Sequence, residues 1–168
     1  MIQTKAPGKL MLTGEWSILT PGNSCISLAL NRYAYVTGIQ SSKWILNSSL
    51  FNDTINFHWS YQHGISLEKP ITAPLAFSLA ALTTTFTFLT ESNHQLPSPH
   101  SITITSHELY DPNTRIKFGF GSSAATTAAL PFRIVDVVRD TALSDGTFQQ
   151  ILVTFNFGLH FYRQATGI

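Results

Sequence analysis

Short segments rich in β-branched and aromatic residues recur through the first part of the chain. They cover residues 33–39, 43–46 and 54–59, and an apolar run at residues 10–13 precedes them. Residues that favour turns separate these segments, at positions 21–23 and 52–53. Such segments are typical of half-buried strands. The pattern therefore predicts a β-rich N-terminal region.

A stripe of apolar residues at helical spacing follows, at Leu75, Leu79, Leu82, Phe86 and Leu89. The surrounding segment, residues 71–90, carries no charge and has about the length that a bilayer span needs. Its large apolar residues nevertheless fall on one side, and threonines occupy much of the rest. This arrangement favours a helix packed in a folded core, so we expect no membrane segment.

The rest of the pattern predicts one strand and two helices. Residues 101–105 alternate between polar and apolar, as a strand does. A helix is expected after them, with Ser122 or Ser123 as its N-cap, and Pro131 is expected to kink or break it. An apolar stripe within residues 148–162 predicts a last helix. Strands followed by helices with an intervening strand indicate a single α+β domain.

Composition adds a prediction about the surface. The chain has 168 residues, of which only 11% are charged, against about 25% in an average soluble protein. We therefore expect an uncharged face that a partner or further sequence covers. A net charge of +1 and the absence of a basic run argue against nucleic-acid binding. The single cysteine, Cys25, and the lack of a long apolar N-terminal stretch favour the cytoplasm.

The first candidate for chemistry is the glycine-serine loop, residues 117–125. Glycines allow a backbone to approach a ligand closely, and a helix that begins at the serines would direct free N–H groups at an anion. The loop matches neither the Walker A motif nor the dinucleotide fingerprint. The alternative is an ordinary glycine loop that caps a helix. The residues are Lys117, Phe118, Gly119, Phe120, Gly121, Ser122, Ser123, Ala124 and Ala125.

The second candidate is Lys9, which lies between Pro7-Gly8 and an apolar strand. A lysine held on a rigid element can stabilise developing phosphate charge. Glu15 follows Gly14 where that strand should end, near any ligand bound at the same edge. The alternative is that each is an ordinary solvated charge.

Together the two segments resemble the first two motifs of the GHMP kinase superfamily. The first is Ala6-Pro-Gly-Lys-Leu-Met-Leu-Thr-Gly-Glu15, and the second is the glycine-serine loop. The residues of these two motifs are most similar to those of the phosphomevalonate kinase family, and the mevalonate kinase family comes second. The resemblance implies an N-terminal domain like domain 2 of ribosomal protein S5, over residues 1–168, with a left-handed βαβ unit.

The resemblance also implies ATP and Mg²⁺ as cosubstrates and phosphomevalonate, or a similar alcohol or phosphate, as the acceptor. Lys9 matches the lysine that assists phosphoryl transfer, and the loop matches the residues around the nucleotide phosphates. Ser123 is the expected magnesium ligand. Lys9, Glu15 and Ser17 are the expected substrate contacts.

The chain also departs from the family pattern. Arg115 stands where the second motif usually has a proline. The family's catalytic aspartate is expected beyond Ile168, and the C-terminal ferredoxin-like domain, which would pack on this one, is absent from the chain. Two alternatives follow from these departures: an inactive fragment that at most binds nucleotide, and an unrelated binding module.

Overall fold

A computed structural model describes residues 2–70 and 73–139 of the chain. Within these ranges it contains one mixed sheet and two α-helices, with two short 3-10 helices in the connections. The helix predicted within residues 148–162 lies outside the described residues. The predicted α+β class is confirmed for the described part.

The sheet has six strands in the order β1-β2-β6-β3-β4-β5. Neighbouring strands are antiparallel except β6 and β3, which run parallel. The strands are β1 Ile2–Thr13, β2 Ile26–Gln40, β3 Trp44–Ser48, β4 Asp53–Ser60, β5 Gly64–Leu67 and β6 His100–Thr105. Because β4 is antiparallel to both of its neighbours, β5 is parallel to β3 and hence to β6. The helix between β5 and β6 therefore completes a βαβ unit, whose left-handedness stays a prediction.

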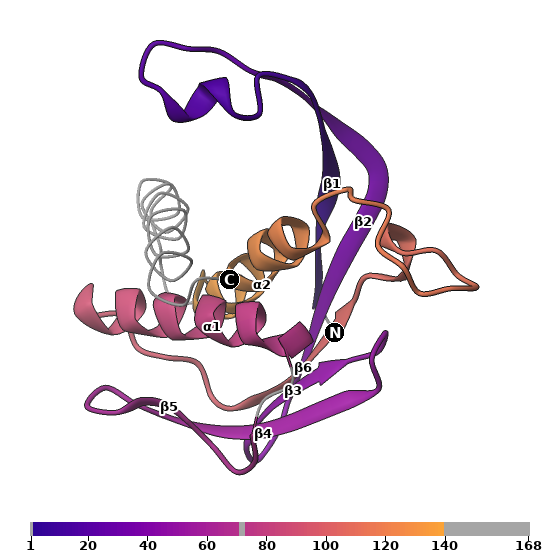
Figure 1. The fold of residues 1–168 in the computed structure, drawn as a ribbon. Coiled ribbons are helices and arrows are strands. Elements are labelled where there is room, and N and C mark those ends of the chain that lie inside the picture. Colours follow the sequence, from indigo (N-terminus) through magenta and orange to yellow (C-terminus); the bar gives the residue numbers. More distant parts are fainter. Residues whose placement is uncertain (1, 71–72, 140–168) are drawn as a thin grey trace.

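Helices α1 (Ala73–Glu91) and α2 (Ser122–Arg139) cover one face of the sheet (Figure 1). The predicted stripe of α1 is confirmed, since each of its five apolar residues is at most 5% exposed. Alternate residues of the central strands meet this stripe, such as Leu46, Phe57 and Ile102. The core thus lies between the sheet and the two helices. Neither helix, over its described length, has the length and apolar character needed to cross a membrane.

The expectations for α2 need two corrections. The first helical bond runs from the Ala125 N–H to the Gly121 carbonyl, at 3.0 Å. The residue at the helix boundary is therefore Gly121, with φ +66°, rather than Ser122 or Ser123. The predicted break at Pro131 is also wrong, because α2 continues through it to Arg139. Pro131 removes the helical bond to the Thr127 carbonyl, but the surrounding turns are held by the buried Leu130 and Ile134.

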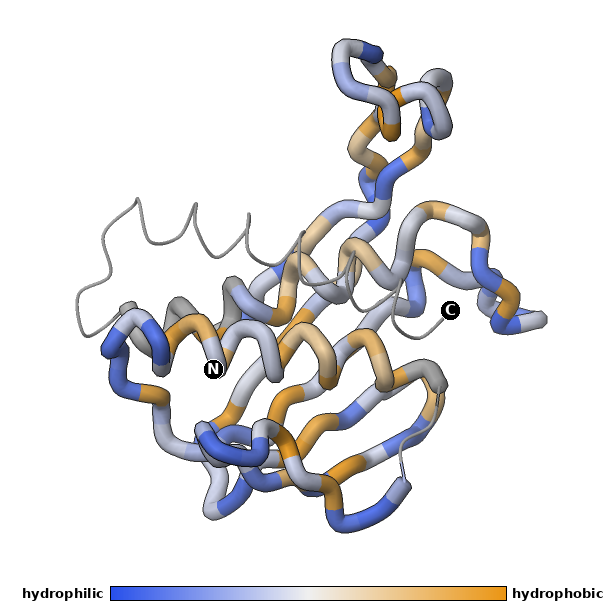
Figure 2. Tube along the Cα trace, turned by 60° about the vertical axis from the view of Figure 1, so that its left-hand side comes forward, coloured by the Kyte–Doolittle hydropathy of each residue, from blue (hydrophilic) through white to orange (hydrophobic). Residues whose placement is uncertain are grey.

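The ends of β1 and β2 that meet in a hairpin project away from the body (Figures 1 and 2). At the tip lies a short 3-10 helix, Ser17–Leu19. Large apolar side chains are exposed along this hairpin, and Trp16 is the most exposed of them, at 81%. The others are Leu10, Leu12, Ile18, Leu19, Ile26 and Leu28. Exposed apolar residues therefore gather on the projecting hairpin, next to the exposed charges of Lys9 and Glu15.

Candidate functional site

The glycine-serine loop connects the sheet to the start of α2. Gly119 and Gly121 both adopt left-handed backbone angles, φ +80° and +66°, that side chains disfavour. Since the Ala125 N–H makes the first helical bond, the N–H groups of Ser122, Ser123 and Ala124 precede the helical ladder. Together with the helix dipole they form a site suited to an anion. The predicted free N–H groups at the start of the helix are therefore present, and anion binding by them stays a prediction.

Lys9 lies directly against this loop. A register shift in β1 between Pro7 and Lys9 places Gly8 at a bulge. The Lys9 N–H donates to the Phe120 carbonyl at 2.9 Å, and a Cβ added at Gly121 would lie 3.2 Å from Lys9 Cγ. The exposed Lys9 side chain thus runs beside the boundary of α2. The fold brings together two segments that lie about a hundred residues apart in the sequence.

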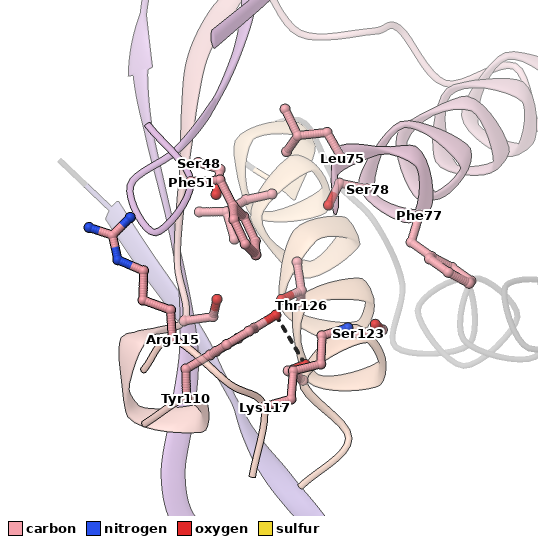
Figure 3. Close-up of a pocket in the computed structure, with 13 residues that line it drawn as sticks. Ser48, Phe51, Leu75, Phe77, Ser78, Tyr110, Arg115, Lys117, Ser123 and Thr126 are labelled. Carbon is pink, nitrogen blue, oxygen red and sulfur yellow. Dashed lines mark hydrogen bonds between the residues drawn. The ribbon is translucent and has the colours of Figure 1, made fainter. Parts of the chain in front are cut away.

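A pocket of about 380 Å³ lies between the start of α2, α1 and the ends of strands β3 and β6 (Figure 3). Its charged lining residues, among those that the structure describes, are Arg115 and Lys117, and no acidic residue lines it. Phe51 and Tyr110 contribute aromatic rings whose centroids lie 5.9 Å apart. The lining residues are Ser48, Phe51, Leu75, Phe77, Ser78, Ile104, Ser106, Tyr110, Arg115, Lys117, Ser122, Ser123 and Thr126. An apolar pocket with a cationic mouth suits a molecule that is both aromatic and anionic.

The two serines of the loop have different environments. Ser122 is buried, and its hydroxyl donates to the Tyr110 hydroxyl at 3.4 Å, the dashed line in Figure 3. Ser123 is half-buried and lines the pocket without such a partner. Of the two, Ser123 is the hydroxyl available to a ligand. Its role towards magnesium stays a prediction, and the described lining residues offer hydroxyl oxygens but no carboxylate to such an ion. Such an ion would need phosphate oxygens and water for its other ligands.

The arm before the loop, residues 110–117, is folded back on itself. Tyr110 and Lys117 form a β-bridge, and the Asp111 carboxylate accepts hydrogen bonds from the backbone N–H groups of Asn113 and Thr114, at 2.9 and 2.8 Å. These bonds, first that from Thr114, lower the pKa of Asp111 below its ordinary value.

Within this arm Arg115 adopts φ +56°. Proline cannot adopt such an angle, since its ring fixes φ near −65°. Proline would therefore not fit the backbone at this position, and Arg115 contributes a guanidinium to the pocket lining.

The structure does not bring every predicted residue to this place. Glu15 and Ser17 lie on the tip of the projecting hairpin and are exposed. The Ser17 hydroxyl donates within the tip, to the Gly14 carbonyl at 3.2 Å. Ala125 packs into the hydrophobic core, whereas Ala124 is exposed. Phe118 and Phe120 lie together, with ring centroids 5.4 Å apart, and do not line the pocket.

Several pocket residues carried no signal in the sequence. Ser48 ends β3 and Phe51 lies in the β3–β4 connection. Leu75 and Ser78 belong to α1, and Ser106 directly follows β6. No motif joins these positions, because the sheet order alone makes them neighbours. Tyr110 and Arg115 are adjacent to the predicted loop, and that proximity is the one signal available.

Comparisons with known proteins point to one class. No protein-family model matches the chain. Phosphomevalonate kinase from Streptomyces sp. (strain CL190) is 27% identical over 135 residues, which cover 74% of this chain and 35% of that protein. The Lin0012 protein from Listeria innocua superimposes with a TM-score of 0.74 at 26% identity, over 94% of this chain and 42% of that one.

A Streptococcus pneumoniae phosphomevalonate kinase, solved with phosphomevalonate and AMPPNP, gives a TM-score of 0.67 at 19% identity, over 92% of this chain and 42% of that chain. Solved mevalonate and sugar kinases share the fold at 20% identity or less. The chain therefore has the fold of the N-terminal part of GHMP kinases, and its predicted resemblance to these phosphotransferases is confirmed. It spans half or less of the length of each protein compared here.

Proposed function

We propose that this chain is the nucleotide-binding part of a cytoplasmic, ATP-dependent small-molecule kinase of the GHMP type. We propose phosphomevalonate as its acceptor, in the mevalonate route to isoprenoids. The observation that carries the proposal is the position of Lys9 against Gly121, beside the first turn of α2. One anion-binding surface would be formed by the Lys9 cation, the N-terminus of α2 and the pocket. No acidic residue lines that pocket in the described part of the chain.

The arrangement suggests how a nucleotide would lie. The Lys9 side chain lies beside Gly121, whereas Ser122 and Ser123, the next residues along the chain, line the pocket. A nucleoside in the pocket would place its phosphates across the glycines and the start of α2, with the terminal phosphate towards Lys9. Ser123 would hold the magnesium ion that accompanies the phosphates and neutralises part of their charge.

In this reaction an oxygen of the acceptor attacks the γ-phosphorus of ATP, and the bond from that phosphorus to the β–γ bridging oxygen breaks. ADP leaves with the electron pair of that bond. Lys9 would stabilise the negative charge on the transferring phosphoryl oxygens. For phosphomevalonate the attacking group is a phosphate oxygen, whereas for mevalonate it is a hydroxyl that must lose a proton.

The choice of phosphomevalonate rests on the sequence resemblance and on the curated relative at 27% identity. A coupled assay with phosphomevalonate, mevalonate and homoserine tests it. Turnover of phosphomevalonate alone is expected, and turnover of mevalonate alone would replace the substrate. The second candidate function is a nucleotide-binding fragment without activity. This candidate is favoured because the chain covers only 35% and 42% of the lengths of two relatives. It predicts ATP binding with no turnover of any acceptor.

Calorimetric titration of ATP, with and without Mg²⁺, tests the nucleotide site itself. Wild type should bind ATP more tightly with Mg²⁺, and Ser123→Ala should lose most of that difference. Thr84→Ala is the matched control, because this hydroxyl donates to the Ala80 carbonyl within α1 and lies outside the pocket lining. Absence of ATP binding by the wild type would refute the proposed function.

We also propose that a further domain covers the projecting hairpin in a longer protein of this type. The exposed Trp16, Leu12 and Leu19 support this, since large apolar surfaces mark interaction sites. In a variant with Trp44 and Trp59 replaced by phenylalanine, Trp16 is the remaining tryptophan of the 168 residues. Acrylamide quenching of its fluorescence should be strong in the 168-residue chain and weak where such a domain follows. Equal quenching in both would remove this part of the proposal.

A further inference from the structure

One carboxylate joins strand β2 to the segment that leads into the glycine-serine loop. Glu108 lies on the short 3-10 helix His107–Leu109, which begins two residues after β6 ends. Its two carboxylate oxygens accept hydrogen bonds from the Tyr33 backbone N–H and from the Tyr35 hydroxyl, each at 2.8 Å. Glu108 is half-buried, and hydrogen bonds to a charged group are stronger than those between neutral groups. The carboxylate therefore fixes the 3-10 helix against β2.

The bond from Tyr33 lies where the pairing of β2 with β6 has ended. That pairing stops at Tyr35, so no residue of β6 stands opposite the Tyr33 N–H. The Glu108 side chain supplies the acceptor there in place of a strand carbonyl. In the other direction across the sheet, Tyr33 pairs with Pro7, two residues before Lys9. Glu108 is thereby linked to the part of β1 that carries Lys9.

The residue after Glu108 carries the link to the loop. The Leu109 carbonyl accepts the Phe118 N–H at 3.2 Å, so the start of the glycine-serine loop is held on Leu109. The fully buried Leu109 side chain also packs against β1, since a Cβ added at Gly8 would lie 2.8 Å from its Cδ2. A shift of the 3-10 helix would therefore move the loop relative to β1.

We propose that Glu108 is a positioning residue of the kinase reaction, which holds the glycine-serine loop and Lys9 at the spacing that a bound nucleotide needs. Glu108 acts through these groups, and it does not line the pocket. The inference rests on the proposed function, because the loop and Lys9 are the groups proposed to contact the phosphates. It goes further by assigning a role to a residue outside both motifs.

This role depends on the length of the side chain and not on its negative charge. Glutamine has the same length as glutamate. Its amide oxygen can accept from the Tyr33 N–H while its NH₂ group donates to the Tyr35 hydroxyl oxygen. Aspartate keeps the charge but is one methylene shorter, so it cannot reach both donors unless the 3-10 helix moves. Glu108→Gln should therefore preserve the site, and Glu108→Asp should not.

Calorimetric titration of the 168-residue chain with ATP and Mg²⁺ measures the effect. Glu108→Ala and Glu108→Asp should each weaken ATP binding by about two- to thirtyfold, the range for residues that act on a site through packed neighbours. Glu108→Gln should change the affinity by less than about twofold, which is the lower limit of that range.

Two controls separate positioning from a loss of stability. Glu68→Ala removes a carboxylate that accepts the Asn56 side-chain NH₂ at 2.8 Å, beside the edge strand β5. Ile55→Ala leaves a cavity at a fully buried position of β4, outside the pocket lining, and should lower the melting temperature. Neither control should change ATP affinity by more than about twofold. Melting temperatures of all variants verify that each is folded.

The Tyr35 hydroxyl reports on the bond directly. Its hydrogen bond to Glu108, together with desolvation and the negative charge of Glu108, raises the pKa of Tyr35 above its ordinary value. In an absorbance titration of tyrosinate formation, Glu108→Gln should lower this pKa towards the ordinary value. Tyr35→Phe identifies the signal, because it removes that titration from the curve.

Several results would overturn the inference. Wild-type ATP affinity in Glu108→Ala would overturn it and leave the proposed function in place. An equal loss of affinity in Glu108→Gln and Glu108→Ala would show that charge matters and position does not. A loss in Ile55→Ala as large as that in Glu108→Ala would reduce the effect to stability. Failure of the wild type to bind ATP would refute the proposed function, and this inference with it.

Discussion

Gly8 is the residue at which the two predicted motifs touch, and replacing it with alanine tests the reasoning about the site. A Cβ at Gly8 would lie 2.8 Å from Leu109 Cδ2 and 2.9 Å from the Phe120 carbonyl oxygen. The leucine is fully buried and the carbonyl belongs to the backbone, so neither can move freely. Ordinary contacts begin at 3.4 Å, so the Phe120 carbonyl must retreat by about 0.5 Å.

That retreat has two costs. Overpacking of this kind destabilises a protein by about 1–3 kcal/mol. The hydrogen bond from the Lys9 N–H to the same carbonyl, now 2.9 Å, would lengthen and lose up to about 1 kcal/mol. The sum is about 1–4 kcal/mol. At about 2–4 °C for each kcal/mol in a chain of this size, the melting temperature should fall by about 2–16 °C.

Differential scanning calorimetry, with and without ATP and Mg²⁺, measures both consequences. Gly8→Ala should melt lower and lose part of the stabilisation that ATP gives the wild type, since the displaced Phe120 carbonyl belongs to the glycine-serine loop. Gly64→Ala is the control: its φ of +67° imposes backbone strain of about 1–2 kcal/mol, but nothing lies near its Cβ and it is remote in sequence from both motifs. If Gly8→Ala melts within about 2 °C of the wild type, the contact between the two motifs is not as described.

Three further predictions test other parts of the account. Lys9→Met should lower turnover about a hundredfold or more in an active protein while ATP affinity stays within about twofold, as steady-state kinetics and calorimetry would show; unchanged turnover would exclude Lys9 from the reaction. Asp111 has a folded-state pKa below its ordinary value, so it contributes stability above that ordinary value and loses the contribution as pH falls through the lowered pKa. Urea unfolding between about pH 6 and about pH 3 should therefore show a smaller loss of stability in Asp111→Asn than in the wild type, and an equal loss would contradict the hydrogen bonds from Thr114 and Asn113. Leu82→Ala, at a fully buried position of α1, should destabilise the protein by about 2–5 kcal/mol in the same assay, against less than about 1 kcal/mol for Thr84→Ala.

The sequence predicted the elements whose own residues determine them. The stripe of α1 was readable because five apolar residues repeat at helical spacing and all of them are buried. The bounds of β1 and β2 were not readable, because the long ladder from Ile2↔Gly38 to Thr13↔Ile26 continues through polar and glycine residues. Strand β5 was missed because Gly64–Leu67 is short and is held by its pairing with β4.

The candidate site was predictable where it consists of contiguous segments. Residues 117–125 and Lys9 were found from glycine, serine and lysine in known patterns, and their contact is present. The inner end of the pocket was not predictable, because Ser48, Ser78 and Ser106 become neighbours only when β3, α1 and β6 pack together. The position of Gly121 at the helix boundary depends on a backbone angle that no propensity of the following serines specifies.

The central claim is that the glycine-serine loop at the start of α2 binds the phosphates of a nucleotide. Hydrogen exchange of the backbone amides, measured with and without ATP and Mg²⁺, tests it most directly, because the N–H groups of residues 119–124 are the proposed ligands. The account predicts slower exchange in that segment and unchanged exchange at the exposed hairpin tip, residues 14–24. Slower exchange at the tip with no change in residues 119–124 would contradict it.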